Sequence, residues 1–313
     1  MSRRNNRGKR PRGRPLDGIL VLDKPKGLSS NEALQQVKRL FNARKAGHTG
    51  SLDPLATGVL PLCMGEATKL SQFLLDADKR YRVTIGLGVS TDTGDAEGQV
   101  VEQVDNVSVT GEQVSQALDG FVGTIDQVPP MYSAIKQQGV PLYKLARQGK
   151  EVERASRRIT IYSIDMLGME NNDLHIEVHC SKGTYIRTLA DDLGRMLACG
   201  AHVKELRRLQ AGAFDESDSV TLERLHELRQ AGEPDEFSPI DEYLLPMDRA
   251  VADLPEVELP DVTAGWIKQG QPVLVRHLPA EGLVRLYQGK QFIGIGSILD
   301  DGRVAPRRMI VNQ

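Results

Sequence analysis

The chain has 313 residues, 40% of them hydrophobic, which is enough for one large domain with a small one, or for two domains of moderate size. No apolar run approaches the roughly 20 residues of a membrane-spanning helix, and the N-terminus lacks the apolar segment of a secretory signal, so we expect a cytoplasmic protein without membrane contact. The net charge of −2 hides a strong asymmetry between segments.

The three cysteines, Cys63, Cys180 and Cys199, are an odd number and form no CxxC pair. Their neighbours are apolar or mixed, which predicts reduced thiols rather than disulfides or a zinc site. The His, Cys and acidic residues also lack the spacing of a ligand set, so we expect no bound metal.

Residues 1–14 carry seven Lys or Arg residues and no acid, whereas residues 215–258 carry fourteen acids and three arginines. The basic tail has no apolar pattern, which predicts disorder. Two interpretations of the tail remain open. It could be a solubilising arm, or it could be attracted to the phosphates of a nucleic acid and so raise the rate of encounter.

The first predicted elements are a strand and a helix. An apolar run at residues 19–22 ends at Lys-Pro-Lys-Gly, which is typical of a strand that feeds a turn. Ser29 with Glu32 three residues later is a capping-box pattern, and apolar side chains at helical spacing continue to Phe41. Apolar positions predict a further helix over residues 67–74.

The segment between these helices includes AGHTGSLDPLATGVLPLCMGEATK, an unusual loop around Asp53. An Asp that precedes a proline is commonly just a turn former. Here, glycines at positions 47, 50 and 58 bracket the carboxylate, His48 lies five residues upstream, and apolar segments flank both ends. Such a framework can hold a carboxylate rigidly and let a ligand approach the backbone closely.

Residues 81–87 alternate between apolar and polar side chains, as in a half-buried strand, and residues 174–180 repeat this pattern. A helix capped by Thr110 is predicted between them. After the second strand the apolar period becomes that of a helix, which places Tyr185 and Arg187 where a strand passes into a helix. Such junctions often display functional side chains.

Three later segments differ in composition. Residues 124–158 contain three prolines, a glycine turn and many basic residues, which predicts an exposed insertion with a helix around 143–147. The acidic, proline-spotted residues 215–258 are interpreted as a connector with one helix at 221–230. Two strands joined at Gln288-Gly289 predict a small β-rich C-terminal domain.

Some short matches carry no prediction of function. Gly86 and Gly88 follow a strand but lack the third glycine and the helix of a dinucleotide site. Asp92-Thr93-Gly94 echoes an aspartic-protease motif, but only once in a chain that would need two copies.

Six fragments are informative together: LDKPKGLSS, GHTGSLDPLATGVLPLCMGEATK, KRYRV, TDTGDAEG, PPMYSAIKQQGVPLYKLARQG and CSKGTYIRTLADDLG. In this order they resemble the bacterial tRNA pseudouridine-55 synthases of the TruB family. The C-terminal FIGIGSI and GRVAPRR resemble the PUA domain of that family. The resemblance covers nearly the whole chain except the basic tail and the acidic connector, and its most specific element is GHTGxLDP.

The resemblance implies an isomerase that converts uridine at position 55, in the T loop of tRNA, to pseudouridine. The N1–C1′ bond is cut, the uracil turns, and C5 becomes attached to C1′. Because reactant and product are isomers, no redox carrier, ATP or metal is required, and we expect no cofactor. The expected partner is the T stem-loop of tRNA, bound by a monomer without an obligate protein partner.

By the same resemblance, Asp53 is the catalytic carboxylate. It could attack C1′, attack C6 of the uracil, or act as the base in an elimination that leaves a glycal, and these routes stay open. Arg187 matches the arginine that pairs with this aspartate. A guanidinium there would favour the charged carboxylate and orient it.

Other substrate-binding positions also follow from the resemblance. Tyr81 matches the tyrosine that stacks on the target base, and Tyr185 and Leu206 match further pocket residues. Without the resemblance, each of the three would be interpreted as a core side chain. His48 matches the residue that occupies the space vacated by the flipped uridine.

Lys24, Lys69 and the basic insertion are candidates for phosphate contacts, since RNA is recognised largely by its shape and flipped bases. The expected fold class is α+β. A catalytic domain at residues 15–250 contains a mixed, mainly antiparallel sheet and an RNA-clamping insertion at about 124–158. A β-barrel-like PUA domain is expected at residues 251–313.

Two functions of other classes are retained as alternatives. A non-catalytic RNA-binding or RNA-chaperone protein with this fold would leave uridine unchanged. A glycoside hydrolase would normally need two carboxylates at a defined separation, and in this sequence Asp53 alone stands out.

The basic tail gives a testable prediction. Deleting residues 2–14 should weaken tRNA binding at low salt and flatten its salt dependence, because cationic side chains without a packing pattern act electrostatically. The chemical step should remain almost intact. Binding isotherms over a salt series measure the slope, and an unchanged slope would show that the tail only solubilises the protein.

Overall fold

The computed structural model describes residues 13–133, 135–233, 235–276 and 278–311. Disorder was predicted for the tail at residues 1–14, of which residues 1–12 lie outside the described residues. Arg14, the last residue of the predicted tail, joins the fold. Its guanidinium pairs with Asp241 and lies 4.1 Å from the ring centroid of Phe237.

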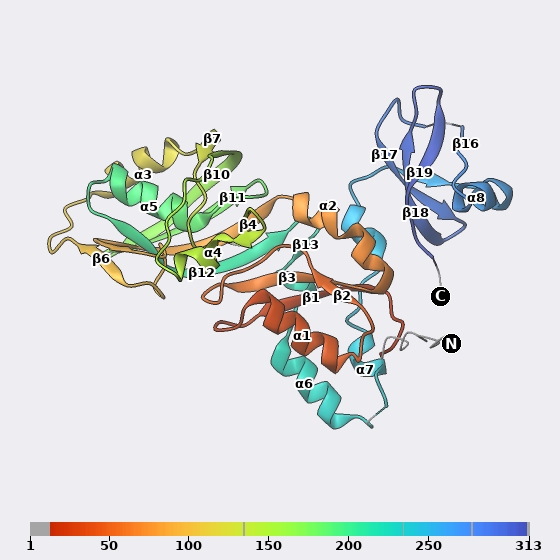
Figure 1. The fold of residues 1–313 in the computed structure, drawn as a ribbon, viewed down its shortest axis with the longest axis horizontal. Helices are drawn as coiled ribbons and strands as arrows, with labels where there is room; N and C mark the ends of the chain where they lie inside the picture. Colours follow the sequence, from red (N-terminus) through yellow and green to blue (C-terminus); the bar gives the residue numbers. More distant parts are fainter. Residues whose placement is uncertain (1–12, 134, 234, 277, 312–313) are drawn as a thin grey trace, which may run out of the picture.

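The main body is built on a ten-stranded sheet with the order β14-β1-β3-β12-β4-β11-β10-β7, to which β2 and β13 are added (Figure 1). Five of the seven pairs along this path are antiparallel, which confirms the predicted mixed, mainly antiparallel sheet. The strands are β1 (Gly18–Lys24), β2 (Ala46–His48), β3 (Thr57–Met64), β4 (Lys79–Leu87), β7 (Gly123–Gln127), β10 (Arg157–Glu170), β11 (Asp173–Cys180), β12 (Ala201–Ala211), β13 (Phe214–Asp215) and β14 (Val220–Thr221).

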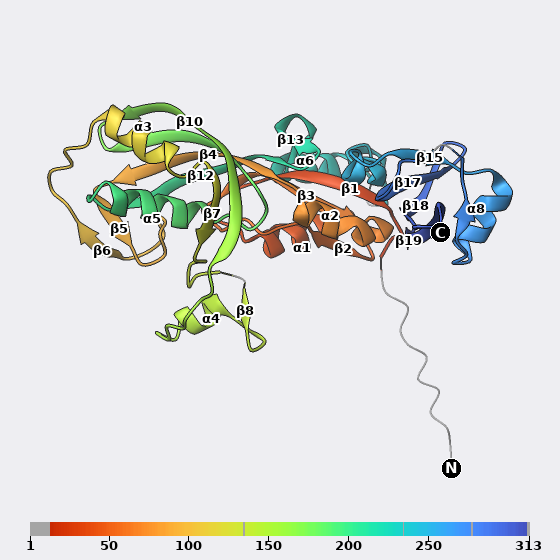
Figure 2. The same cartoon turned by 90° about the horizontal axis from the view of Figure 1, so that it is seen from above.

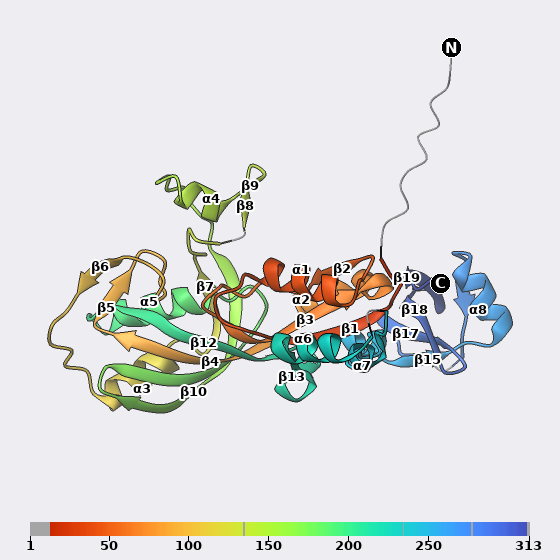
Figure 3. The same ribbon diagram turned by 90° about the horizontal axis from the view of Figure 1, so that it is seen from below.

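Helices α1 and α5 lie on one side of this sheet (Figures 2 and 3), and α2 packs against its other face. The helical segments of the main body are α1 (Ser30–Leu40), η1 (Gly65–Leu70), α2 (Ser71–Asp76), α3 (Gly111–Asp119), α4 (Leu142–Ala146), α5 (Ile186–Met196), η2 (Glu216–Asp218), α6 (Leu222–Ala231), α7 (Ser238–Asp241) and η3 (Met247–Val251). A separate hairpin of β5 (Val89–Thr91) and β6 (Val100–Gln103) follows β4.

The apolar run of β1 is buried on both faces of the sheet. Leu20 and Leu22 join the core that α1 and α5 cover, while Ile19 and Val21 face a second core completed by η3. A strand buried on both faces is apolar continuously rather than alternately, which accounts for the unbroken run in the sequence.

The predicted helix starts are confirmed. Ser29 caps α1 in a capping box with Glu32, and Thr110 caps α3 in the same way with Gln113. Tyr185 is the N-cap residue of α5, so the junction expected at this position is present.

The insertion differs from the prediction at its two ends. β7 pairs with the start of β10, from Gln127↔Arg157 to Gly123↔Ile161, so these residues extend the central sheet. The excursion itself contains α4 and the short hairpin of β8 (Lys136–Gln137) and β9 (Val140–Pro141). It stands out from the side of the sheet that carries α1 and α5 (Figures 2 and 3).

The helix predicted at 221–230 is confirmed as α6, but the rest of residues 215–258, predicted to be a connector, packs into the main body for much of its length. β14 pairs with β1, α6 packs against α1, and Arg249 forms an ion pair with Asp218 at 2.7 Å. Sparse apolar residues among the acids carry this packing. The buried ones are Val220, Leu222, Leu225, Ile240, Ala250, Val251 and Val257.

The C-terminal segment forms a five-stranded sheet with its own core, which confirms the predicted small β-rich domain (blue in Figure 1). The phenol of Tyr287 donates to Asp248 at 2.5 Å and so ties this sheet to the segment before it. Its elements are β15 (Glu256–Glu258), α8 (Asp261–Lys268), β16 (Val273–Leu274), β17 (Leu283–Gln288), β18 (Gln291–Ile298) and β19 (Arg303–Met309).

Candidate active site

The loop between β2 and β3 is tied down on both sides of Asp53. Ser30, in the first turn of α1, donates its hydroxyl to the carbonyl of Leu52 at 3.0 Å and accepts the Leu52 N–H at 2.7 Å. On the other side, the N–H of Gly27 donates to the carbonyl of Pro54 at 2.8 Å. The backbone of Asp53 is therefore held between two anchors.

Two of the three glycines around this loop have a backbone that disfavours a side chain. Gly50 has φ +109° and Gly58 has φ +97°. A Cβ atom at Gly58 would lie 2.3 Å from the backbone oxygen of Arg208, so β3 and β12 can meet there because this residue lacks a side chain. Gly47 has open space around the position of a Cβ atom.

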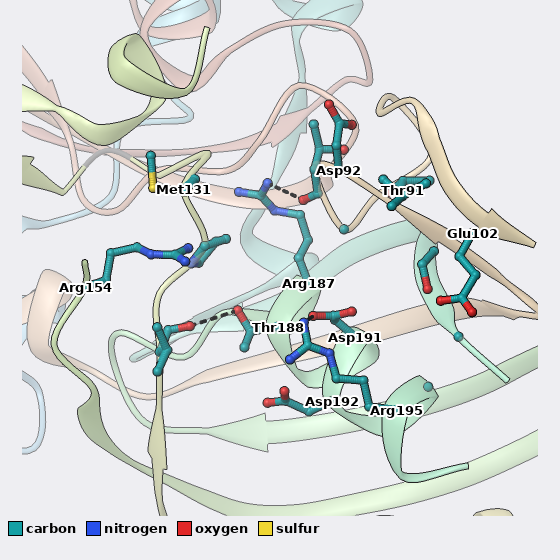
Figure 4. A pocket seen from close by; sticks show the side chains of 18 of the residues that line it. Thr91, Asp92, Glu102, Met131, Arg154, Arg187, Thr188, Asp191, Asp192 and Arg195 are labelled. Atoms are coloured by element: carbon teal, nitrogen blue, oxygen red, sulfur yellow. Dashed lines mark hydrogen bonds and ion pairs between the residues drawn. The ribbon is translucent and has the colours of Figure 1, made fainter. Parts of the chain in front are cut away.

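Arg187 reaches Asp53 from the first turn of α5, and its Nε lies 2.9 Å from the carboxylate Oδ2. The other two nitrogens donate to backbone carbonyls, Nη1 to Thr93 at 3.0 Å (Figure 4) and Nη2 to Tyr132 at 2.7 Å. The side chain of Arg187 is 6% exposed and that of Asp53 is 40% exposed. A buried and fully bonded guanidinium thus orients a carboxylate that a ligand can still reach.

Asp95 is a second carboxylate at the same guanidinium, with its Oδ2 3.6 Å from Nη1 of Arg187. The residue is buried, and its Oδ1 accepts the hydroxyl of Thr93 at 2.6 Å and the N–H of Glu97 at 3.1 Å. Arg187 therefore serves one accessible and one buried carboxylate.

Burial raises the pKa of the Asp53 carboxyl above its ordinary value. The Arg187 guanidinium opposes this rise, the nearby Asp95 charge adds to it, and Lys24 opposes it more weakly. The ionised form of a carboxyl with a raised pKa is more basic than that of a free aspartate. This suits either a base or a nucleophile.

The two predicted tyrosines lie near this carboxylate. Tyr81 on β4 and Tyr185 at the start of α5 both have a phenol pKa that is raised by burial and, to a smaller extent, by the charge of Asp53. The amide of Gln127 bonds the backbone N–H and carbonyl of Tyr185 at 2.8 and 3.1 Å. Leu206 on β12 is buried in the same core as Tyr81.

His48 lies on β2, immediately before the loop. Burial lowers its pKa, the Arg208 guanidinium lowers it further, and the ring is therefore neutral at pH 7. Its Nδ1 is buried and has no hydrogen-bond partner among the described residues.

Lys24 does not fit the predicted phosphate contact. The residue is fully buried, and its Nζ donates to the carbonyls of Pro25 at 2.9 Å and Leu28 at 2.6 Å. Burial lowers the pKa of the Lys24 ammonium to about 8, although the Asp53 charge opposes this shift. The sequence pattern did not reveal that the chain folds over this side chain.

Lys69, like Lys24, was predicted to contact phosphate, but in the structure it bonds other parts of the protein. Its Nζ donates to Glu66 at 2.5 Å and to the carbonyl of Met309 at 2.9 Å. Glu66 in turn accepts the N–H of Val311 at 2.9 Å. Lys69 therefore links η1 to the C-terminal sheet, away from the Asp53 loop.

Asp95 and Arg208 are residues of this site that the sequence patterns did not indicate. Asp95 lies in the fragment TDTGDAEG, where the comparison with a protease motif drew attention to Asp92 instead. Arg208 follows Arg207 on one strand, and period-two alternation does not say which of the two faces inward. The structure buries Arg208 and leaves Arg207 partly exposed.

A cleft of about 710 Å³ opens beside Arg187, between α5, the insertion and the β5–β6 hairpin (Figure 4). Asp92, Asp191 and Asp192 line it together with Arg154. Asp53 does not line this cleft, which meets the carboxylate site at Arg187.

The described residues provide no preformed set of metal ligands. Within the described ranges, no group of three or more His, Cys, Asp or Glu side chains is arranged to hold an ion. Burial raises the pKa of the Cys63 thiol to about 12 and that of Cys180 to about 11.

In the part of the chain that the structure describes, no helix is both long and apolar enough to cross a membrane.

Three family models match successive parts of the chain. They are the TruB family pseudouridylate synthase N-terminal domain at residues 38–186, the tRNA pseudouridylate synthase B C-terminal domain at 187–252, and the pseudouridine synthase II TruB C-terminal domain at 255–310. Together they span most of the sequence.

Curated relatives agree with these models over nearly the full length. The chain is 58% identical to tRNA pseudouridine synthase B of Serratia proteamaculans over 307 residues, which cover 96% of this chain and 98% of the relative. It is 57% identical to the protein of the same name from Yersinia enterocolitica, with 96% and 93% of the two chains covered.

Solved structures share the fold. A chain of a Cbf5-Nop10-Gar1 complex matches with a TM-score of 0.71 and 27% identity, covering 95% of this chain and 84% of that one. A chain of an H/ACA RNP bound to a substrate RNA containing 2′-deoxyuridine matches with a TM-score of 0.73 and 24% identity, covering 99% and 93%.

The geometry around Arg187 predicts the effect of Asp95→Asn. Removing this charge should lower the pKa of Asp53 and move the acidic limb of the pH–rate profile for uridine isomerisation to lower pH. Loss of one partner of Arg187 should also slow the reaction about tenfold, or roughly 1.4 kcal/mol.

Asp92→Asn is the matched control, because Asp92 lies in the same turn but accepts the N–H of Gln99 instead of contacting Arg187. Its profile should match that of the wild type. An Asp95→Asn profile that superimposes on the wild-type profile would contradict the proposed coupling.

Proposed function

Because the chain belongs to the TruB family of pseudouridine synthases, we propose that it isomerises the uridine at position 55 in the T loop of tRNA. The observation that carries this proposal is the anchored, accessible Asp53 carboxylate with the Arg187 guanidinium 2.9 Å away. The relatives named tRNA pseudouridine synthase B support the substrate class.

The proposed reaction needs no net supply of atoms or electrons. The N1–C1′ bond breaks, a C5–C1′ bond forms, C5 loses a proton and N1 gains one. Asp53 would act as the nucleophile at C1′ or C6, or as the base of an elimination. Each route requires an ionised, directed carboxylate, which is the state that Arg187 favours.

The target uridine must leave its stack before its sugar can reach Asp53. We propose that Tyr81 stacks on the flipped base, that Tyr185 and Leu206 complete its pocket, and that His48 fills the vacated space. A neutral imidazole suits that last role, because it can lie among bases without burying a charge.

The rest of the chain would hold the tRNA. We propose that the insertion clamps the T stem-loop, since it stands out from the sheet on the side of α1 and α5 (Figure 2). The C-terminal sheet, as a PUA-like domain, would add RNA contacts. We expect the protein to act as a monomer, without an obligate protein partner.

The alternative is an RNA-binding protein of this fold without catalysis. Turnover separates the two functions, because a binder leaves uridine unchanged. Mapping of pseudouridine in tRNA before and after incubation with the purified protein measures it. Absence of new pseudouridine at position 55 would contradict the proposal.

Asp53→Asn should separate binding from chemistry. The amide keeps the size of the carboxylate but removes its charge and nucleophile. We expect tRNA affinity within about tenfold of wild type, or 1.4 kcal/mol, and no detectable pseudouridine in single-turnover assays. A near-normal rate would show that Asp53 is only a turn residue.

Arg187→Lys should bind tRNA but react slowly. An ammonium is a point charge, so it cannot bond Asp53 and the carbonyls of Thr93 and Tyr132 in one planar arrangement. We expect a loss of about 100-fold in the single-turnover rate, or roughly 2.7 kcal/mol. A rate within threefold of wild type would contradict this role.

A further inference from the structure

Arg208 on β12 is a buried guanidinium whose charge has no carboxylate partner among the described residues. The residue is 1% exposed, and in the described part of the chain it forms no ion pair. Its Nε donates to the carbonyl of Val59 at 2.6 Å, whereas its Nη2 is buried and has no hydrogen-bond partner among the described residues. A buried cation without a carboxylate is costly, so packing alone does not account for it.

The surroundings of Arg208 belong to the candidate active site. Tyr81 is its register partner on β4, and Gly58, just after the Asp53 loop, is its partner on β3. A Cβ atom at Gly50 would lie 3.8 Å from its Nη1. The guanidinium therefore lies between the loop that carries Asp53 and the strand that carries Tyr81.

Electrostatic effects on two neighbours agree with this position. The Arg208 charge lowers the pKa of His48, in the same direction as burial. At Tyr81, burial raises the phenol pKa, and the charge and hydrogen bonding of Arg208 oppose that rise. Arg208 thus acts on the residues proposed to stack on the uridine and to replace it.

We propose that Arg208 is a positioning residue, which holds the Tyr81 phenol and the His48–Asp53 loop in the arrangement that receives a flipped uridine. This inference rests on the proposed function and adds a residue to it. Arg208 touches no reacting atom in this role and acts through Tyr81 and the loop.

Arg207 provides a matched control on the same strand. Its Nη1 and Nη2 bind the two carboxylate oxygens of Asp23 at 3.0 and 2.9 Å, and its Nε binds Glu216 at 2.6 Å. Arg207 is therefore an ordinary ion-paired arginine. Arg207→Lys and Arg208→Lys make the same chemical change at adjacent positions with different surroundings.

The first measurement compares single-turnover rates and tRNA affinities of the two lysine variants. For Arg208→Lys we expect a rate loss of about 30-fold, or roughly 2 kcal/mol, and tRNA affinity within about threefold. Arg207→Lys should keep a rate within about threefold of wild type. Equal losses in the two variants, or a normal rate in Arg208→Lys, would overturn the inference.

A double-mutant cycle with Tyr81→Phe tests whether Arg208 acts through Tyr81. Residues that share one function lose less together than the product of their separate losses. We expect the rate of Arg208→Lys/Tyr81→Phe to be close to that of the slower single variant. Losses that multiply would show that Arg208 does not act through Tyr81 and would overturn the inference.

A measurement that does not depend on catalytic activity can test the role of Arg208 separately from the proposed function. The pKa of His48, followed by NMR of the imidazole and assigned with His48→Gln, should rise in Arg208→Lys if the charge moves away from the ring. It should not change in Arg207→Lys. Inactive wild-type protein would contradict the proposed function, whereas an unchanged His48 pKa in Arg208→Lys would overturn the role of Arg208.

Discussion

One guanidinium joins three separate segments of this protein to the start of α5. Arg187 contacts the carboxylate of Asp53, the carboxylate of Asp95, and the backbone carbonyls of Thr93 and Tyr132. A buried arginine without such acceptors would destabilise the fold, because its charge would be neither solvated nor paired. The loop, the turn after β5 and the root of the insertion must therefore meet at the start of α5.

The Asp53 loop also lies beside the contact that joins the two parts of the central sheet. β3 and β12 run parallel and share the register pairs Arg207↔Thr57 and Arg208↔Gly58, and through them the β14-β1-β3 part meets the β12-β4-β11-β10-β7 part. The Asp53 loop enters β3 directly before this contact. Close approach of the two backbones at Gly58 thus places the loop against the strand that carries Leu206 and Arg208.

The charged side chains around this junction differ in their exposure to solvent. Asp53 remains accessible, while Arg187, Asp95, Lys24 and Arg208 are buried. The buried charges act on the pKa of Asp53 and of its neighbours without meeting solvent, so they are weakly screened. The protein thus tunes one reachable carboxylate through charged groups that are themselves buried.

Sequence patterns that span only a few residues were sufficient to predict the local secondary structure. Ser29 with Glu32, and Thr110, marked helix starts because a cap is satisfied by a backbone N–H three residues away. Alternation marked β4 and β11, and the GHTGxLDP element placed Asp53 in its loop. The resemblance also supplied the fold class and the pairing of Arg187 with Asp53, which the structure reproduces at 2.9 Å.

Tertiary structure alone decided which charged side chains the fold encloses. Lys24 and Lys69 were expected on an RNA surface, but one is buried beneath the turn after β1 and the other binds the C-terminal sheet. Asp95 and Arg208 gave no local signal, since their partners come from distant parts of the chain. Periodicity assigns a side chain to one of two faces, whereas burial and pairing depend on which remote segment covers that face.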